Sequence, residues 1–173
     1  MSVTKARSQA RSEKPVEPAY RALIRTMGLL RRVMEPYFAK YGISASQWSV
    51  LRALNRAEQE DRLKGIRLTD LSDRLLVRPP SVTGTVDRLE RTGLVSRAAS
   101  RTDQRAKMVR LTFTGRQLVH RVRASHAARV QSVLAALRRD EQRQLHYLLD
   151  RLGDHLEELN DSANSRAHHN GHK

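Results

Sequence analysis

The 173-residue chain contains no cysteine, which excludes a disulfide framework, a thiolate zinc site and a thiol-based redox switch. Aromatic residues make up only 4% of it, so few aromatic side chains are available to stack on the bases of a single-stranded nucleic acid. No apolar run approaches the roughly 20 residues of a membrane helix, and the first residues lack the apolar core of a signal peptide. We therefore expect a soluble, cytoplasmic protein without a membrane partner.

Positive charge, by contrast, is abundant. The chain has 33 lysine and arginine residues against 18 acidic ones, a formal net charge of +15. A surplus of this size informs on partners rather than on the fold, and polyanions such as DNA are the first candidates. A homodimer would double the charge.

Long apolar stripes mark both ends of the chain. Leu23 and Met27 begin a run of apolar residues at three- and four-residue steps, which predicts an amphipathic helix over 19–43. A last helix, for which we expect Asp140 to be the cap, has leucines at near-heptad spacing: Leu145, Leu148, Leu152 and Leu156. One small core is too short to cover both stripes, so we expect a two-fold homodimer. A helical bundle within a single chain is the alternative.

The middle of the chain has shorter elements. Ser44 and Gln47 have capping-box spacing and predict a helix start, whereas the charged stretch 55–65 is typical of a loop.

A short helix follows this loop, then a turn at Val77, then a second helix. Pro79 and Pro80 favour the start of this second helix, because the first turn of a helix needs no amide donors. Two alternating strands with a polar tip between them predict a β-hairpin. Helix, turn, helix and hairpin together indicate a winged helix-turn-helix.

The second helix of this motif has one short, polar face. Val82, Val86 and Leu89 recur at i, i+4 and i+7 and predict an inward stripe. The small side chains opposite them allow the helix to approach base edges and phosphates closely. An arginine on a thin hairpin tip suits a narrow minor groove. The candidate DNA contacts are Arg78, Pro79, Ser81, Thr83, Gly84, Thr85, Arg88, Arg101, Asp103, Arg105 and Lys107.

At these residues the sequence resembles the MarR family of winged helix-turn-helix regulators. The matching stretches are LTDLSDRLLVRPPSVTGTVDRLERTGLVSR and TDQRAKMVRLTFTG. The resemblance implies an obligate homodimer on a palindromic operator, acting as a repressor that a small aromatic or anionic ligand releases. It also implies that Arg105 enters the minor groove and that Asp103 braces the wing. Asp87 resembles the acidic residue that orients a wing arginine in this family.

The resemblance also implies a ligand pocket near the junction of the first two helices. Aromatic and apolar residues gather there in the sequence, and a cavity needs such walls together with a few polar anchors. An arginine is suited to bind an anion. The candidate ligand residues are Met34, Tyr37, Phe38, Trp48 and Arg52. The alternative is that the aromatic side chains simply fill the core.

Other functions find less support. There is no glycine-rich phosphate loop, nucleophile elbow or metalloprotease helix, so we expect neither an enzyme nor a cofactor. His146, Asp150 and Asp154 share a helix face, but without further convergent ligands we expect no metal site. An architectural protein that binds DNA with little sequence specificity and no effector stays open as an alternative. A protein-interaction scaffold is a third class.

The expected fold class is thus mainly α with a small β-hairpin wing, a winged helix-turn-helix with a helical dimerisation region. The predicted segments are a flexible basic arm (1–18), an N-terminal dimerisation helix (19–43), the winged helix-turn-helix domain (44–113), C-terminal dimerisation helices (114–160) and a disordered tail (161–173).

Overall fold

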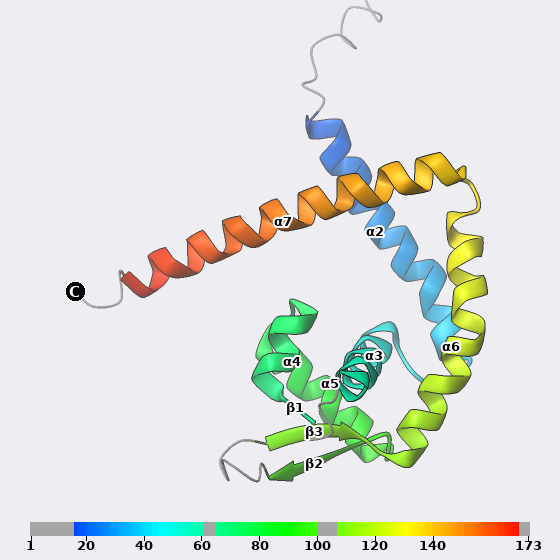
Figure 1. The fold of residues 1–173 in the computed structure, drawn as a ribbon, viewed down its shortest axis with the longest axis vertical. Helices are drawn as coiled ribbons and strands as arrows, with labels where there is room; N and C mark the ends of the chain where they lie inside the picture. Colours follow the sequence, from blue (N-terminus) through cyan, green and yellow to red (C-terminus); the bar gives the residue numbers. More distant parts are fainter. Residues whose placement is uncertain (1–15, 61–64, 100–106, 170–173) are drawn as a thin grey trace, which may run out of the picture. The chain divides into compact units, whose positions relative to one another are not determined.

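A computed structural model describes residues 16–60, 65–99 and 107–169 (Figure 1). The chain divides into two compact units that meet in sequence between Ser125 and His126. The elements are α2 (Val16–Ala39), α3 (Ala45–Gln59), β1 (Ile66–Arg67), α4 (Leu68–Leu75), α5 (Pro79–Arg91), β2 (Val95–Ala99), β3 (Lys107–Leu111), α6 (Phe113–Leu134) and α7 (Arg139–His169). This mainly helical order with a small antiparallel sheet confirms the predicted fold class. Among the described residues, no helix has the length and apolarity that crossing a membrane requires.

The sheet of the first unit has three strands in the order β1-β3-β2. β2 and β3 form the predicted hairpin, with Val95 opposite Leu111. β1 pairs with β3 through Ile66 and Val109, and the sequence analysis missed this strand because two residues show no alternation. Thr112 follows β3, and its hydroxyl donates to the carbonyl of Gly93 over 2.7 Å.

The core of the first unit lies between its helices and the sheet. Val82, Val86 and Leu89 of α5 are buried, which confirms the inward stripe. They share the interior with Leu51 of α3 and Leu71 of α4, among other apolar side chains. The apolar spacing of α5 therefore fixes which face of this helix remains outside.

Local sequence signals predict some helix ends of the first unit and miss others. Ser44 caps α3, since its hydroxyl accepts from the amide of Gln47 and the side chain of Gln47 accepts from the amide of Ser44. The loop predicted from residue 55 is wrong as far as Gln59, which is still helical. Buried Ala57 favours the longer helix. At the other end of the unit, α2 begins at Val16, three residues before the predicted start of the N-terminal helix.

The second unit consists of the end of α6 and of α7. α7 begins at Arg139, so Asp140 lies within its first turn and is not the cap. Instead, the carboxylate of Glu141 accepts from the amide of Arg138 over 2.8 Å. The helix continues to His169, and the prediction of a disordered tail is therefore wrong over 161–169. The side chain of Gln142 donates to the carbonyls of Leu134 and Leu137, where α6 passes into α7.

Candidate nucleic-acid interface

α4 and α5 form a helix-turn-helix with a tight turn. α4 ends at Leu75 and is followed by its C-cap Leu76, whose φ of 52° lies in the left-handed region that few residues other than glycine adopt. The amide of Val77 donates to the carbonyl of Ser72 and closes the turn. Pro79 and Pro80 then occupy the first positions of α5, as predicted from their missing amide hydrogens. This turn fixes where the N-terminus of α5 emerges.

The outer face of α5 carries most of the predicted DNA contacts. Ser81, Thr83 and Arg88 are exposed and Gly84 is half-buried. Arg78 and Pro79 are exposed at the start of the helix. The face is therefore open and lined by short side chains near its N-terminus, as an approach to base edges requires.

Thr85 does not belong to this face. The residue is only 5% exposed, and its hydroxyl donates to the carbonyl of Ser81 over 2.9 Å. The prediction that Thr85 lies on the outer face is therefore wrong, because the inward stripe of α5 is wide enough to include it. Its hydroxyl also accepts from a guanidinium nitrogen of Arg88 over 3.3 Å, so Thr85 contributes to the placement of Arg88.

Arg97 joins the base of the hairpin to α5. Its guanidinium lies 2.6 Å from the carboxylate of Asp87 and 2.7 Å from that of Glu90, and its amide donates to Glu90 over 3.0 Å. Burial opposes the charge of Arg97, but the hydrogen bonds and charges of both carboxylates outweigh it and raise the pKa of Arg97 above its ordinary value. Glu90 was missed by the sequence analysis, although its i+3 spacing from Asp87 puts both on one helix face.

The tip of the hairpin lies beyond the described part of the chain. Arg101, Asp103 and Arg105 fall within 100–106, outside the described residues. Lys107 is the first residue of β3. The predicted roles of these four residues therefore stay predictions.

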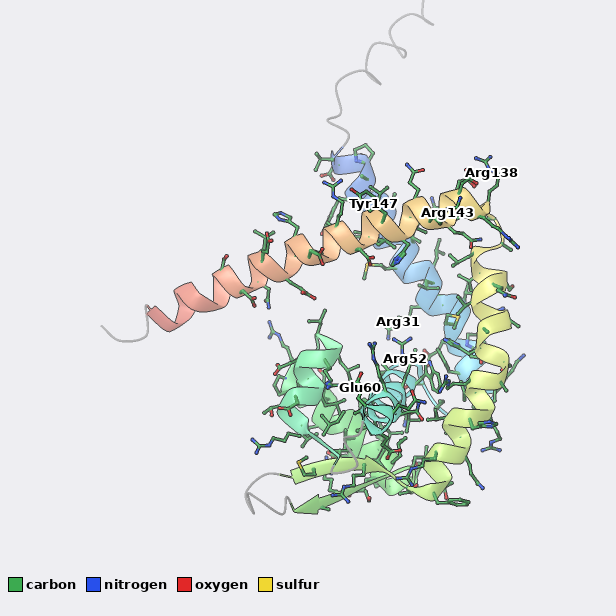
Figure 2. All side chains as sticks on the ribbon, viewed as in Figure 1. Arg31, Arg52, Glu60, Arg138, Arg143 and Tyr147 are labelled. Atoms are coloured by element: carbon green, nitrogen blue, oxygen red, sulfur yellow. The ribbon has the colours of Figure 1, made fainter. Side chains whose placement is uncertain are left out.

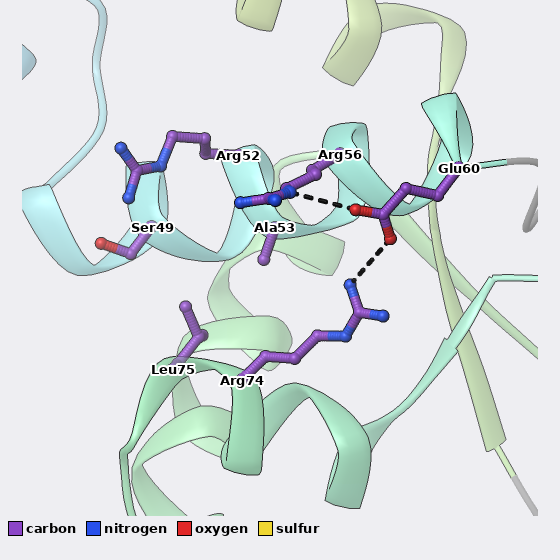
Figure 3. A pocket seen from close by; sticks show the side chains of 7 residues that line it. All are labelled: Ser49, Arg52, Ala53, Arg56, Glu60, Arg74 and Leu75. Carbon is purple, nitrogen blue, oxygen red and sulfur yellow. Dashed lines mark hydrogen bonds and ion pairs between the residues drawn. The ribbon is translucent and has the colours of Figure 1, made fainter. Parts of the chain in front are cut away.

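The predicted ligand residues separate into two places. Met34, Tyr37, Phe38 and Trp48 are buried, and the rings of Phe38 and Trp48 stack with centroids 5.9 Å apart. Arg52 is exposed and lines an open cavity between α3 and α4 (Figure 3). None of the other four residues lines that cavity. The structure thus places four of the five in the core and one on a polar surface.

Apolar side chains remain exposed on both predicted dimerisation helices. On α2, Met27 is 59% exposed, whereas Leu23 is half-buried. On α7, the four predicted leucines are all exposed: Leu145, Leu148, Leu152 and Leu156. Polar and aromatic side chains accompany them, including Arg143 and Tyr147, which Figure 2 labels on α7.

The comparisons with known proteins identify the family. A model of the MarR family matches residues 41–106, which span the helix-turn-helix and reach the hairpin. The transcriptional activatory protein BadR of Rhodopseudomonas palustris is 34% identical over 125 residues, covering 70% of this chain and 69% of BadR. The chain belongs to the MarR family. Its function class is accordingly DNA binding and regulation of transcription, and this family is one of regulators rather than of enzymes.

Two further relatives support the assignment to the MarR family. The transcriptional regulator PecS of Dickeya dadantii is 29% identical over 153 residues, covering 86% of this chain and 90% of PecS. A crystal structure of a cysteine-to-serine mutant of MarR from E. coli, complexed with operator DNA, matches with a TM-score of 0.72 and 25% identity. It covers 79% of this chain and 94% of the MarR chain.

The face of α7 that carries His146 was considered above as a metal site. His146 lies 3.2 Å from Asp150 across one helical turn, and both are exposed. Over 16–60, 65–99 and 107–169, no three histidine or acidic side chains are placed to hold a metal ion.

Proposed function

We propose that this MarR-family protein is a homodimeric repressor that binds a palindromic operator and is released by a small aromatic or anionic ligand. The observation that carries the DNA-binding part is the outer face of α5, where the side chains of Ser81, Thr83 and Gly84 are short or absent and the surface is polar. Behind that face, the buried apolar stripe holds the helix in a fixed orientation. A rigid helix with short outer side chains suits a major groove.

The contacts divide into two kinds under this proposal. Ser81, Thr83 and Gly84 approach base edges, whereas Arg78 and Arg88 reach phosphates. The hairpin contributes Arg105 to the minor groove, and Arg97 holds the hairpin base against α5. Reading the major and the minor groove together requires this link between wing and helix.

The dimer part rests on the exposed apolar side chains of α2 and α7. Monomeric proteins rarely leave so many large apolar residues in water, because each square ångström of apolar surface buried contributes about 25 cal/mol. A second copy of the chain buries them symmetrically. The exposed residues are Val16, Tyr20, Ile24, Met27, Leu29, Leu30 and Val33 on α2, and Leu145, Tyr147, Leu148, Leu149, Leu152, Leu156 and Leu159 on α7.

Competition between duplexes separates the proposal from the architectural alternative. A specific regulator prefers its operator over a scrambled duplex by about 10³ or more at physiological salt. Fluorescence anisotropy with labelled operator and unlabelled competitor measures this ratio. A ratio near one, despite tight binding, contradicts the proposal and favours the architectural protein.

The wing assignment has its own test. We expect Arg105→Ala to weaken operator binding by about 1–3 kcal/mol, the scale of one good groove contact. Arg121→Ala, an exposed arginine on α6, is the control and leaves the affinity unchanged. Wild-type affinity for Arg105→Ala in a folded dimer contradicts the wing assignment.

Repression itself is tested by transcription. We expect transcripts from a promoter that overlaps the operator to fall when the protein is added in vitro. An increase in transcripts identifies an activator and contradicts repression, while leaving the DNA-binding proposal in place.

A further inference from the structure

Three arginines line the cavity between α3 and α4 (Figure 3). Its volume is about 550 Å³. The lining residues are Ser49, Arg52, Ala53, Arg56, Glu60, Arg74 and Leu75. Among the described residues that line the cavity, there are three guanidinium groups and one carboxylate, an excess of two positive charges. Ala53 and Leu75 supply an apolar part of the wall.

Glu60 shows how a carboxylate fits this cavity. One of its oxygens lies 3.0 Å from Nε of Arg56, and the other lies 3.6 Å from Nη1 of Arg74 (Figure 3). Glu60 is the C-cap of α3, so its carboxylate connects the end of α3, which carries Arg56, with α4, which carries Arg74. The pair with Arg56 is well exposed, so it contributes little stability and is easily rearranged.

Arg52 is the third arginine among the described residues that line the cavity. It lies one helical turn before Arg56 on α3 and is labelled together with Glu60 in Figure 2. Among the residues that the structure describes, none forms an ion pair or hydrogen bond with the guanidinium of Arg52. A guanidinium is always charged and offers a planar fork of donors that matches a carboxylate.

We propose that this cavity binds a small dianion with two carboxylates on a flat apolar body. One carboxylate pairs with Arg52 and the other with Arg74, while Glu60 keeps Arg56. This arrangement balances three guanidinium groups with three carboxylates. The apolar body lies against Ala53 and Leu75, as ligand pockets combine apolar walls with a few charged anchors.

The position of the cavity connects it with DNA binding. Arg74 and Leu75 end α4, the first helix of the helix-turn-helix. Ser49, Arg52, Arg74 and Leu75 also line a neighbouring hollow that extends to Arg88 and other residues of α5. A ligand that bridges α3 and α4 therefore acts on the elements that place α5. This regulatory part rests on the proposed function, whereas the binding site does not.

Calorimetric titration of the full chain with isophthalate (benzene-1,3-dicarboxylate) tests the site. We expect saturable binding of one isophthalate per chain, weaker binding of benzoate and no binding of the neutral diamide. Arg52→Ala and Arg74→Ala each weaken the affinity by about tenfold or more, because each removes a charge-assisted pair. Arg121→Ala, outside the cavity, leaves it unchanged. Glu60→Gln strengthens binding, since it removes the negative charge that repels the ligand.

Two results overturn the site. One is the absence of isophthalate binding to folded protein; the other is binding that Arg52→Ala and Arg74→Ala do not change. Operator anisotropy on the same variants separates this outcome from a failure of the proposed function. If the two variants bind isophthalate normally but lose operator affinity, the arginines serve DNA phosphates and the site is wrong. If isophthalate binds as expected but leaves operator affinity unchanged, the site stands and its role as effector site is contradicted.

Discussion

At the scale of single residues, Arg97 connects the hairpin to α5. Its side chain is only 18% exposed and lies between Asp87 and Glu90. Because its pKa is raised above the ordinary arginine value, the stabilisation is fully present below that ordinary value and is lost only as the pH rises through the higher folded value. Titration of Arg97 itself therefore contributes no pH dependence near neutrality.

We expect Asp87→Asn and Glu90→Gln each to lower the free energy of unfolding by less than about 1 kcal/mol, since both carboxylates are substantially exposed and screened. Their effect on operator affinity is larger than on stability, because each loosens the hairpin base. Urea denaturation and anisotropy on the same samples measure the two effects. Unchanged operator affinity in both variants contradicts the role of Arg97 in placing the wing.

Gly84 gives a second prediction at this scale. A β-carbon at this position meets only the flexible end of Arg88, at 3.9 Å, so no contact within the chain requires glycine. We expect Gly84→Ala to stabilise the protein by about 0.5–1 kcal/mol through helix propensity. Operator affinity falls at the same time, because the methyl group separates α5 from the bases. A more stable variant with full operator affinity contradicts the placement of Gly84 against DNA.

At the scale of elements, the sequence predicts those parts that obey a local rule. The apolar spacing of α5, the capping box at Ser44 and the alternation of β2 and β3 each have a local physical cause, and the structure contains all three. β1, the end of α3 and the burial of Thr85 depend on tertiary packing, which no short window of sequence reveals. The predicted ligand residues separate for a related reason, because Trp48 is buried and Arg52 is exposed although the two lie one helical turn apart on α3.

The junction of β2, β3 and α6 depends on close packing at Gly115. A β-carbon there collides with the carbonyl oxygen of Leu94, a backbone atom that cannot move aside. We therefore expect Gly115→Ala to lower the free energy of unfolding by about 1–3 kcal/mol, opposite in sign to Gly84→Ala. Urea denaturation of both variants provides the comparison. A Gly115→Ala variant as stable as the wild type contradicts the packing at this junction.

At the scale of the whole molecule, the account requires a second copy of the chain. The exposed apolar residues of α2 and α7 have no cover within their own units. Neither their number nor their position follows from the helix-turn-helix motif. The sequence pattern predicted them because leucines at near-heptad spacing are typical of helix–helix interfaces.

We expect the double variant Leu148→Glu, Leu152→Glu to sediment as a monomer, because two charges replace apolar contacts in the proposed interface. Operator affinity falls with it, since a monomer binds one half-site only. Gln144→Glu adds a charge at an exposed polar position of the same helix and leaves the dimer intact. A double variant that remains dimeric at micromolar concentration contradicts the proposed interface.

Selection of binding sites from a random duplex library at physiological salt is the most direct test of the central claim, sequence-specific DNA binding by a dimer. The account predicts enrichment of a palindrome whose half-sites lie about one helical turn apart. Tight binding without any enriched sequence contradicts it, because such binding rests on charge and DNA shape alone.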